Sequence, residues 1–549
     1  MREQPGFFRR HIALIAALGI GAAYAATVFL LILRETGGRF IYSLDDAYIH
    51  LAIAKHIVQN GVWGVTPFGF SSSSSSILWP ILLAAAMKIF GVREIIPFVF
   101  ALAASAALMA VLYSEWMARE DRPGWAFGML IVWMLLLPLG PILFNGMETM
   151  LQALAAVALA AVAVRYLAAE KPVSLLPLCL LAALAAVVRY EGCFVAAAVC
   201  LLLALRGRWK AALLVGLSAA VPVILFGIYS LGQGWSFLPN SVLVKYNGIG
   251  GLSLSSLWGV VARPFQPITE ASTMRLPVWQ TLAVVALALL LLRARANPFR
   301  GFWDDRLLPA VIFLMVALLH SAGITGDTFF RYQAYLNALG IWAVGCTGIP
   351  LVDWGAVRCH AAAAIAAGGA AALLAVPLAD QAFQGIWKTP LASQNIYQQQ
   401  YQMGLFLNAY YPQGNVAAND IGAIDFLADL HLEDLFGLAS REVMQAKLDG
   451  TWHQDLAGTM DRLTSADGTR IAVLYDNWFD PDPATGRASV PAQWVRVAAW
   501  TIPDNVVCGG ATVTWYAILP EEAPALKDAL TRFATGLPAG VTVRYFPIP

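Results

Sequence analysis

Two adjacent carboxylates, Asp45 and Asp46, stand in a short polar run near the N-terminus, and Tyr48 and His50 follow within the same run. Paired carboxylates are suited to removing a proton from an acceptor hydroxyl or to holding a divalent cation. His50 follows Asp46 by four residues, so the two side chains share one face of a helix. Asp45 has a plainer interpretation as the N-cap of that helix. The run predicts a site for acid–base chemistry or substrate binding, with a divalent cation as an open alternative.

Three basic residues, Arg189, Lys245 and Arg331, lie close to the ends of apolar stretches, outside any basic run. Guanidinium and ammonium groups in such places suit a phosphate or pyrophosphate. Arg189 has an alternative partner in Glu191 or in lipid headgroups, and Lys245 on a loop is equally consistent with a solvated side chain. Together with the carboxylates, these residues predict a sugar-phosphate site.

Five further polar residues complete the set of candidates for substrate contact: Glu148, Glu191, Asn240, Asp327 and Tyr332. Each belongs to a short polar cluster between apolar stretches. The topology derived below places all the clusters on one side of a membrane. This convergence favours a functional site over isolated structural polar residues.

The stretches that position these residues are strongly apolar. Of the 549 residues, 59% are hydrophobic and 13% are charged, about half the charge of an average soluble domain. Such stretches predict about eleven transmembrane helices. The candidate spans are residues 12–33, 94–117, 125–144, 149–167, 172–188, 192–206, 211–231, 277–293, 307–322, 333–350 and 361–378. The net charge of +1 and the lack of a basic tract give no indication of a nucleic-acid partner.

The order of the loops follows from the distribution of Arg and Lys. Residues 77–90 are too few to cross a bilayer, so we expect this run to lie in the outer interface. With the N-terminus inside, the short inner loops then hold most of the basic residues. A first outer loop therefore covers residues 34–93, including the six serines at 71–76, which are expected to be a flexible linker. The transmembrane catalytic domain is predicted to be residues 1–378.

The composition changes after residue 379, where Asp, Asn, Gln and turn residues become frequent. Short strand-like runs appear at 416–418, 471–475, 494–500, 513–519 and 541–546, with a helical stretch at 521–533. We expect an extracytoplasmic α/β domain over residues 379–549. The fold class is thus an all-α polytopic membrane domain with a C-terminal α/β domain.

Several motifs resemble those of the GT-C glycosyltransferases, and most closely the arabinofuranosyltransferase- and mannosyltransferase-like enzymes of bacterial cell envelopes. The first is the run 44–49 (LDDAYI), followed by the serine-rich stretch and by Leu78-Trp79 at the start of an apolar helix. The motifs at 146–149 (GMET), 189–192 (RYEG), 238–240 (LPN) with Lys245, and 326–327 (GD) with Arg331 follow in the same order. The likeness covers about residues 40–335, and 419–422 and 434–437 resemble the exported domain that often follows such a core.

This resemblance implies an inverting transfer of a sugar from a polyprenyl-phosphate donor to a glycan, lipid or protein acceptor on the outer face of a bacterial inner membrane. It implies that Asp45 is the catalytic base, with Asp46 as second choice or as a positioning group. The other implied roles are phosphate binding by Arg331, Lys245 and Arg189, and hydroxyl contact by Glu148. Tyr190 stands where the motif has proline, and His50 where it has a small or polar residue, so the sugar is left open.

Two other functions remain as alternatives. A lipid-sugar transporter or flippase would place binding residues near the membrane midplane, often in inverted repeats, whereas the predicted helix centres carry no Asp, Glu, Lys or Arg and no repeat is apparent. An oligosaccharide polymerase or ligase would share the outward site and its basic residues. The convergent outward carboxylates favour the glycosyltransferase.

Overall fold

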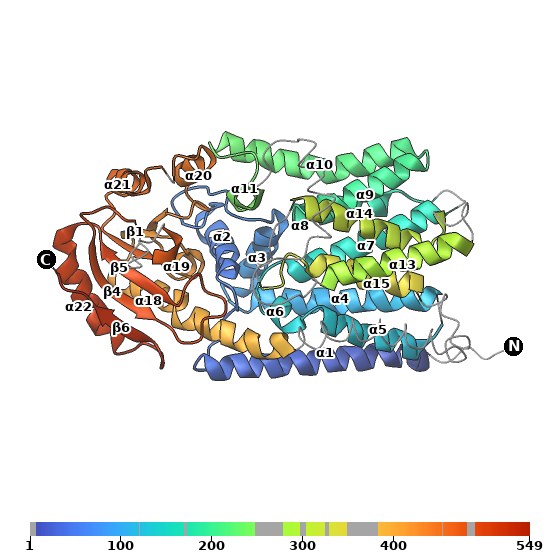
Figure 1. Ribbon diagram of the computed structural model, residues 1–549, viewed down its shortest axis with the longest axis horizontal. Helices are drawn as coiled ribbons and strands as arrows, with labels where there is room; N and C mark the ends of the chain where they lie inside the picture. The colour runs from blue at the N-terminus through green and yellow to red at the C-terminus, as the bar shows by residue number, and fades with distance from the viewer. Residues whose placement is uncertain are drawn as a thin grey trace.

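The computed structural model describes residues 7–119, 121–169, 173–246, 278–296, 303–323, 329–348, 383–452, 454–479 and 489–548. Figure 1 shows an elongated molecule in which the apolar helices run side by side along the long axis. The C-terminal α/β domain lies at one end, and the N-terminus lies at the other. Three short helices of interest, α2, α3 and α11, lie between the helical bundle and the α/β domain (Figure 1).

Helices long and apolar enough to cross a bilayer are α1 (Phe7–Glu35), α4 (Ile96–Arg119), α7 (Thr149–Ala168) and α10 (Trp209–Gly232). The shorter helices of the bundle are α5 (Pro123–Leu136), α6 (Leu139–Leu143), α8 (Leu176–Val188), α9 (Gly192–Leu205), α13 (Val278–Ala296), α14 (Leu308–Gly323) and α15 (Ala334–Gly348). The chain is a multi-pass membrane protein. Each predicted span within the described residues coincides with helix, and the span at 361–378 lies outside them. The total of about eleven crossings stays a prediction.

The predicted span 125–144 is divided into α5 and α6 by Leu137 and Pro138. Leu137 has extended backbone angles, as expected for the residue that precedes a proline. Pro138 has no N–H to continue the helical hydrogen bonds. The break therefore follows from the sequence, although the apolar run alone indicated one continuous helix.

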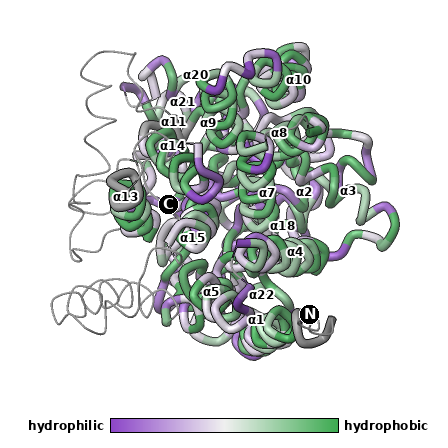
Figure 2. Tube along the Cα trace, turned by 90° about the vertical axis from the view of Figure 1, so that its right-hand side faces the viewer, coloured by the Kyte–Doolittle hydropathy of each residue, from purple (hydrophilic) through white to green (hydrophobic). Residues whose placement is uncertain are grey.

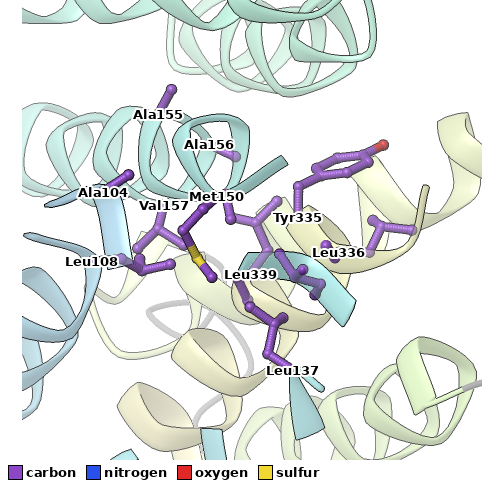
Figure 3. Packing of buried hydrophobic residues seen from close by; sticks show 14 of the residues in the cluster. Ala104, Leu108, Leu137, Met150, Ala155, Ala156, Val157, Tyr335, Leu336 and Leu339 are labelled. Atoms are coloured by element: carbon purple, nitrogen blue, oxygen red, sulfur yellow. The ribbon is translucent and has the colours of Figure 1, made fainter. Parts of the chain in front are cut away.

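Small side chains allow α7 to pack closely in the centre of the bundle. Ala155, Ala156 and Val157 are almost completely buried. Figure 3 shows Val157 beside Leu108 of α4, and α15 also packs against α7. Close approach of this kind increases van der Waals contact between helices, which is a main source of helix association within a membrane.

The outer helices keep apolar side chains on the surface of the molecule. Figure 2, viewed along the long axis, shows hydrophobic residues predominating on α1, α8 and α10. Leu30, Leu180 and Leu225 are each more than 60% exposed. Exposed leucines at this density are expected on surfaces that face lipid.

The segment between α1 and α4 folds into the interior of the protein. In α2 (Asp46–Asn60) the residues from Ala47 to His56 are all buried, and Gly61 ends the helix with φ +70°. The six serines at 71–76, which we call the serine segment, lead into α3 (Leu78–Phe90). Each serine is at most 6% exposed. The expectation of a flexible linker was therefore wrong, because these serines are packed inside the protein and most of them are hydrogen-bonded.

The C-terminal part is an α/β domain, which confirms that prediction. Its strands are β1 (Asn415–Ala418), β2 (His431–Asp434), β3 (Ile471–Leu474), β4 (Val495–Thr501), β5 (Thr512–Ala517) and β6 (Thr542–Tyr545). They form a sheet in the order β2-β1-β3-β5-β4-β6. Strand β1 pairs in parallel with β2 and β3, and the remaining pairs are antiparallel. Strand β2 was not predicted, and the boundary predicted after residue 378 lies outside the described residues.

The helices of this domain are α18 (Gln400–Tyr410), α19 (Gly422–Leu427), α20 (Arg441–Leu448), α21 (Leu456–Ala466) and α22 (Ala523–Ala534). Phe406 of α18 packs against Trp500 and Trp515 of the sheet, with its ring centroid 4.7 Å from that of Trp515. Phe533 of α22 stacks on Trp500. These aromatic contacts fix α18 and α22 on one face of the sheet, and α19 is left beside α2 (Figure 1).

Candidate functional site

A cavity of about 140 Å³ lies where α2, the serine segment, α11 (Asn240–Tyr246) and the α/β domain meet. We call it the Asp46 cavity. It is lined by Asp46, Ile49, His50, Ser73, Ser75, Met147, Ser241, Arg331, Tyr332 and Leu438. Residues far apart in the sequence thus form one site, and four of them, Asp46, His50, Arg331 and Tyr332, were candidates from the sequence.

Asp46 and Arg331 form an ion pair in the wall of this cavity. Arg331 Nη1 donates to Asp46 Oδ2, and Arg331 Nη2 donates to the Tyr332 hydroxyl at 2.8 Å. Arg331 is 8% exposed, and its Nε has no hydrogen-bond partner among the described residues. The Asp46 side chain is 38% exposed. The site therefore presents a carboxylate and an incompletely bonded guanidinium to the same space.

Arg189 lies behind this pair in a second, fully buried network. Its Nη1 donates to Glu148 Oε1 at 3.1 Å, while Nε and Nη2 donate to the two oxygens of Glu191 at 3.1 and 3.0 Å. Its guanidinium also lies 5.6 Å from the centre of the Tyr332 ring. The Arg189–Glu191 pairing that the sequence offered as the plainer reading is present. A guanidinium that is hydrogen-bonded to two carboxylates has a fixed position, so it can hold the adjacent Tyr332 ring in place.

His50 connects the cavity to the buried network. Its Nε2 lies 3.6 Å from Glu148 Oε2, and its Nδ1 lies 3.2 Å from the hydroxyl of Ser74. Burial lowers the pKa of His50 below its usual value, against the opposing effect of Glu148. The imidazole is therefore neutral near pH 7. Its place one turn after Asp46 agrees with the helical spacing in the sequence.

Asp45 faces the α/β domain. Its two carboxylate oxygens accept hydrogen bonds from the backbone N–H groups of Gly422 at 2.6 Å and Ala423 at 2.8 Å. Burial raises the pKa of Asp45 to about 6, opposed by hydrogen bonds from Asp420 and from these amides. Within the described part of the chain, the residues lining the Asp46 cavity include Asp46 but not Asp45. The helix-cap alternative for Asp45 is not seen, because its side chain makes no capping bond within α2.

Asp420 supports Asp45 from the α/β domain. Burial and the neighbouring Asp45 raise the pKa of Asp420 well above its ordinary value. Asp420 Oδ2 also accepts a hydrogen bond from Gln400 Nε2 at 2.8 Å. Two adjacent buried carboxyls favour a shared proton, because both cannot readily be charged together.

Several other predicted site residues have structural contacts. Asn240 Nδ2 donates to the carbonyl of Gly437 at 2.9 Å and so joins α11 to the α/β domain. Tyr48 is fully buried between the rings of Tyr42 and Tyr401. The backbone of Lys245 belongs to α11. Asp327 lies outside the described residues.

The residues that sequence reasoning missed are Ser73, Ser75, Ser241, Met147 and Leu438. The serines were visible as a composition signal but were interpreted as a linker. Met147 lies within a noted motif, and Leu438 comes directly after another. No group of three or more His, Cys, Asp or Glu side chains arranged to hold a metal ion occurs among the described residues.

Comparison with known proteins gives the following findings. Residues 394–516 match a family described as a domain of unknown function (DUF8728), and no curated protein matches the chain. The chain is similar to ArnT from Cupriavidus metallidurans, solved bound to undecaprenyl phosphate, with 13% identity and a TM-score of 0.48, over 91% of this chain and 98% of that one.

The chain is also similar to the oligosaccharyltransferase of Archaeoglobus fulgidus in the apo form, with 12% identity and a TM-score of 0.48, over 92% of this chain and 75% of that one. At these identities and TM-scores, the chemistry has to be argued from the residues of this chain.

Proposed function

We propose that this protein is a GT-C-type glycosyltransferase that moves a sugar from a polyprenyl-phosphate donor to an acceptor hydroxyl in the Asp46 cavity. The observation that carries the proposal is the pairing of a partly exposed carboxylate, Asp46, with a buried guanidinium, Arg331, in a cavity lined by hydroxyl groups. A carboxylate supplies the base that the acceptor needs, and a guanidinium supplies the charge that a departing phosphate needs.

Asp46 is the better candidate for the base than Asp45. A general base needs an oxygen within reach of the acceptor proton, and both oxygens of Asp45 already accept backbone hydrogen bonds. Asp46 is the residue between Ile41 and His50 that is not buried, and it lines the cavity. We therefore assign the base to Asp46 and a docking role to Asp45.

Arg331 is the proposed phosphate ligand. Its Nε is free of hydrogen bonds to the described residues, and its Nη1 is shared with Asp46. Nε and Nη2 carry N–H groups on the same edge of the guanidinium, so a phosphate that takes both would form a bidentate contact, while Nη1 stays with Asp46.

The transfer is a single displacement. Asp46 accepts the proton of the acceptor hydroxyl while that oxygen bonds to the anomeric carbon of the sugar. The bond from that carbon to the phosphate oxygen breaks, and the polyprenyl phosphate leaves with the electron pair beside Arg331. One displacement inverts the anomeric centre. Because Arg189 is held by Glu148 and Glu191, its proposed role is to hold Tyr332 in place.

The remaining expectations stay part of this proposal. These are an outward-facing site in a bacterial inner membrane, a glycan, lipid or protein acceptor, phosphate contact by Lys245 and substrate contact by Asp327. The positive-inside asymmetry of the sequence supports the outward orientation.

The test measures polyprenyl phosphate, the product that every polyprenyl-phosphate sugar donor releases. The full-length protein is reconstituted in lipid and incubated with a panel of polyprenyl-phosphate monosaccharides and candidate acceptors, and released polyprenyl phosphate is measured by mass spectrometry. We expect Asp46→Asn to slow release about 10²–10⁴-fold with donor affinity largely retained. Turnover by Asp46→Asn close to that of the natural protein would refute the assignment of the base. Failure of the natural protein to release polyprenyl phosphate from any donor would refute the proposed function.

A further inference from the structure

The serine segment presents its side chains in two alternating sets. Ser72 Oγ accepts a hydrogen bond from Ser230 Oγ at 3.3 Å. Ser74 Oγ donates to the carbonyl of Ser76 at 2.6 Å, and Ser76 Oγ accepts the N–H of Trp79 at 2.9 Å. The even-numbered serines are thus bonded to the protein.

The odd-numbered serines next to the cavity behave differently. Ser73 and Ser75 line the Asp46 cavity. Ser73 Oγ donates to Ser71 Oγ at 3.1 Å and keeps its lone pairs for another donor. Ser75, which is 6% exposed, also turns to the cavity. Successive side chains of an extended segment point to opposite sides. Ser72, Ser74 and Ser76 are bonded to the protein, so Ser73 and Ser75 are the serines whose side chains are available to a ligand in the cavity.

A third hydroxyl reaches the same cavity from another element. Ser241 of α11 lines it, and Ser241 Oγ is buried without a hydrogen-bond partner among the described residues. Burial of a hydroxyl without a partner is unfavourable. Hydroxyl groups that line the cavity on two separate walls, one of them buried without a partner among the described residues, indicate the place of a polar, uncharged part of a ligand.

The position of these hydroxyls is fixed by Asn240. Its backbone N–H donates to the carbonyl of Ser72 at 2.9 Å, and its side chain donates to the carbonyl of Gly437. One residue thus connects the serine segment, α11 and the α/β domain. Polar groups held in this way are preorganised, so a ligand does not have to order them when it binds.

We propose that Ser73, Ser75 and Ser241 bind the hydroxyl groups of the transferred sugar ring and determine which sugar is accepted. This inference rests on the proposed function, which places the donor phosphate at Arg331. A serine hydroxyl both donates and accepts a hydrogen bond, as does a sugar hydroxyl. A site built to bond a hydroxyl discriminates strongly against an analogue that lacks it, because its own polar groups are then left unpaired.

The experiment compares a sugar-bearing lipid with the same lipid without sugar. Full-length protein in lipid nanodiscs is titrated with farnesyl phosphate and with farnesyl-phosphate hexoses and pentofuranoses, and binding is measured by native mass spectrometry. We expect at least one sugar-bearing lipid to bind more tightly than farnesyl phosphate. Ser73→Ala, Ser75→Ala and Ser241→Ala should each reduce this preference about two- to tenfold, while the affinity for farnesyl phosphate stays the same.

The matched control is Ser72→Ala, which removes a hydroxyl from the same segment on the side that faces the protein. It should leave the preference for the sugar unchanged. Equal effects of Ser72→Ala and Ser75→Ala, or no preference for any sugar of the panel, would overturn the inference about the serines. If farnesyl phosphate itself does not bind, or binds Arg331→Ala as tightly as the natural protein, the proposed function fails and the inference fails with it.

Discussion

Replacing Asp45 by asparagine separates the docking role from the catalytic role. Both oxygens of the Asp45 carboxylate accept backbone N–H groups, those of Gly422 and Ala423. The asparagine oxygen can keep one of these bonds, and its NH₂ group can donate to Asp420. One buried N–H then loses its acceptor, which costs about 1–3 kcal/mol. The docked state of α19 should weaken about 5- to 150-fold.

Hydrogen–deuterium exchange of the full-length protein in lipid measures this directly. Peptides covering residues 420–428 should exchange faster in Asp45→Asn, while peptides from β3 and β5 in the same domain should keep their rates. Asp46→Asn provides the matched control, because it neutralises the adjacent carboxylate without touching α19. In this control the exchange of residues 420–428 should stay as in the natural protein.

The reasoning fails if the two substitutions show the opposite pattern. Unchanged exchange in Asp45→Asn together with a 10²–10⁴-fold loss of turnover would mean that Asp45 is the base. It would also mean that the two amide hydrogen bonds contribute little to docking. The assignment of the base to Asp46 would then have to be abandoned.

Two further predictions concern pH and the donor. Burial raises the pKa of Asp45 from 3.8 to about 6 and raises the pKa of Asp420 well above 3.8. Protonation of these carboxyls therefore favours the docked state. The stabilisation of docking should be complete below about pH 4 and be lost as the pH rises through 6 and above. Exchange of residues 420–428, corrected for its intrinsic pH dependence, checks this, and slower exchange at high pH would contradict it. Arg331→Ala should weaken donor affinity by about 1.5–3 kcal/mol, and Arg331→Lys should restore part of the loss because a point charge replaces a fork. A loss confined to acceptor affinity would place the phosphate elsewhere.

The helices and most strands follow from the sequence because their signals are local. Apolar runs of sufficient length mark the bundle, and β-branched or aromatic runs mark five of the strands. Strand β2 was not predicted, because His431, Glu433 and Asp434 give it a polar sequence. It lies at the edge of the sheet and pairs only with β1. Hydrogen bonding to β1 stabilises it without an apolar pattern.

The site was only partly predictable. The sequence grouped Asp46 with Arg331, and the structure brings them into contact across 285 positions. It could not distinguish Asp46 from Asp45, because consecutive residues at the start of a helix point about 100° apart, and only tertiary packing decides which of them meets α19. Gly422 permits that packing, since a Cβ atom there would lie 2.1 Å from the carbonyl oxygen of Asp45.

Leu438 of the α/β domain forms part of the wall of the Asp46 cavity, so the cavity is incomplete until this part of the chain has been synthesised. Ribosomes synthesise the chain from residue 1, and domains generally fold as units during that process. Asp46, the serine segment and Arg331 are all present long before Leu438 and the amides that hold Asp45. An unfinished chain therefore carries Asp46 and Arg331 without an enclosed site. Synthesis and folding of the α/β domain would therefore be needed before the Asp46 cavity is enclosed.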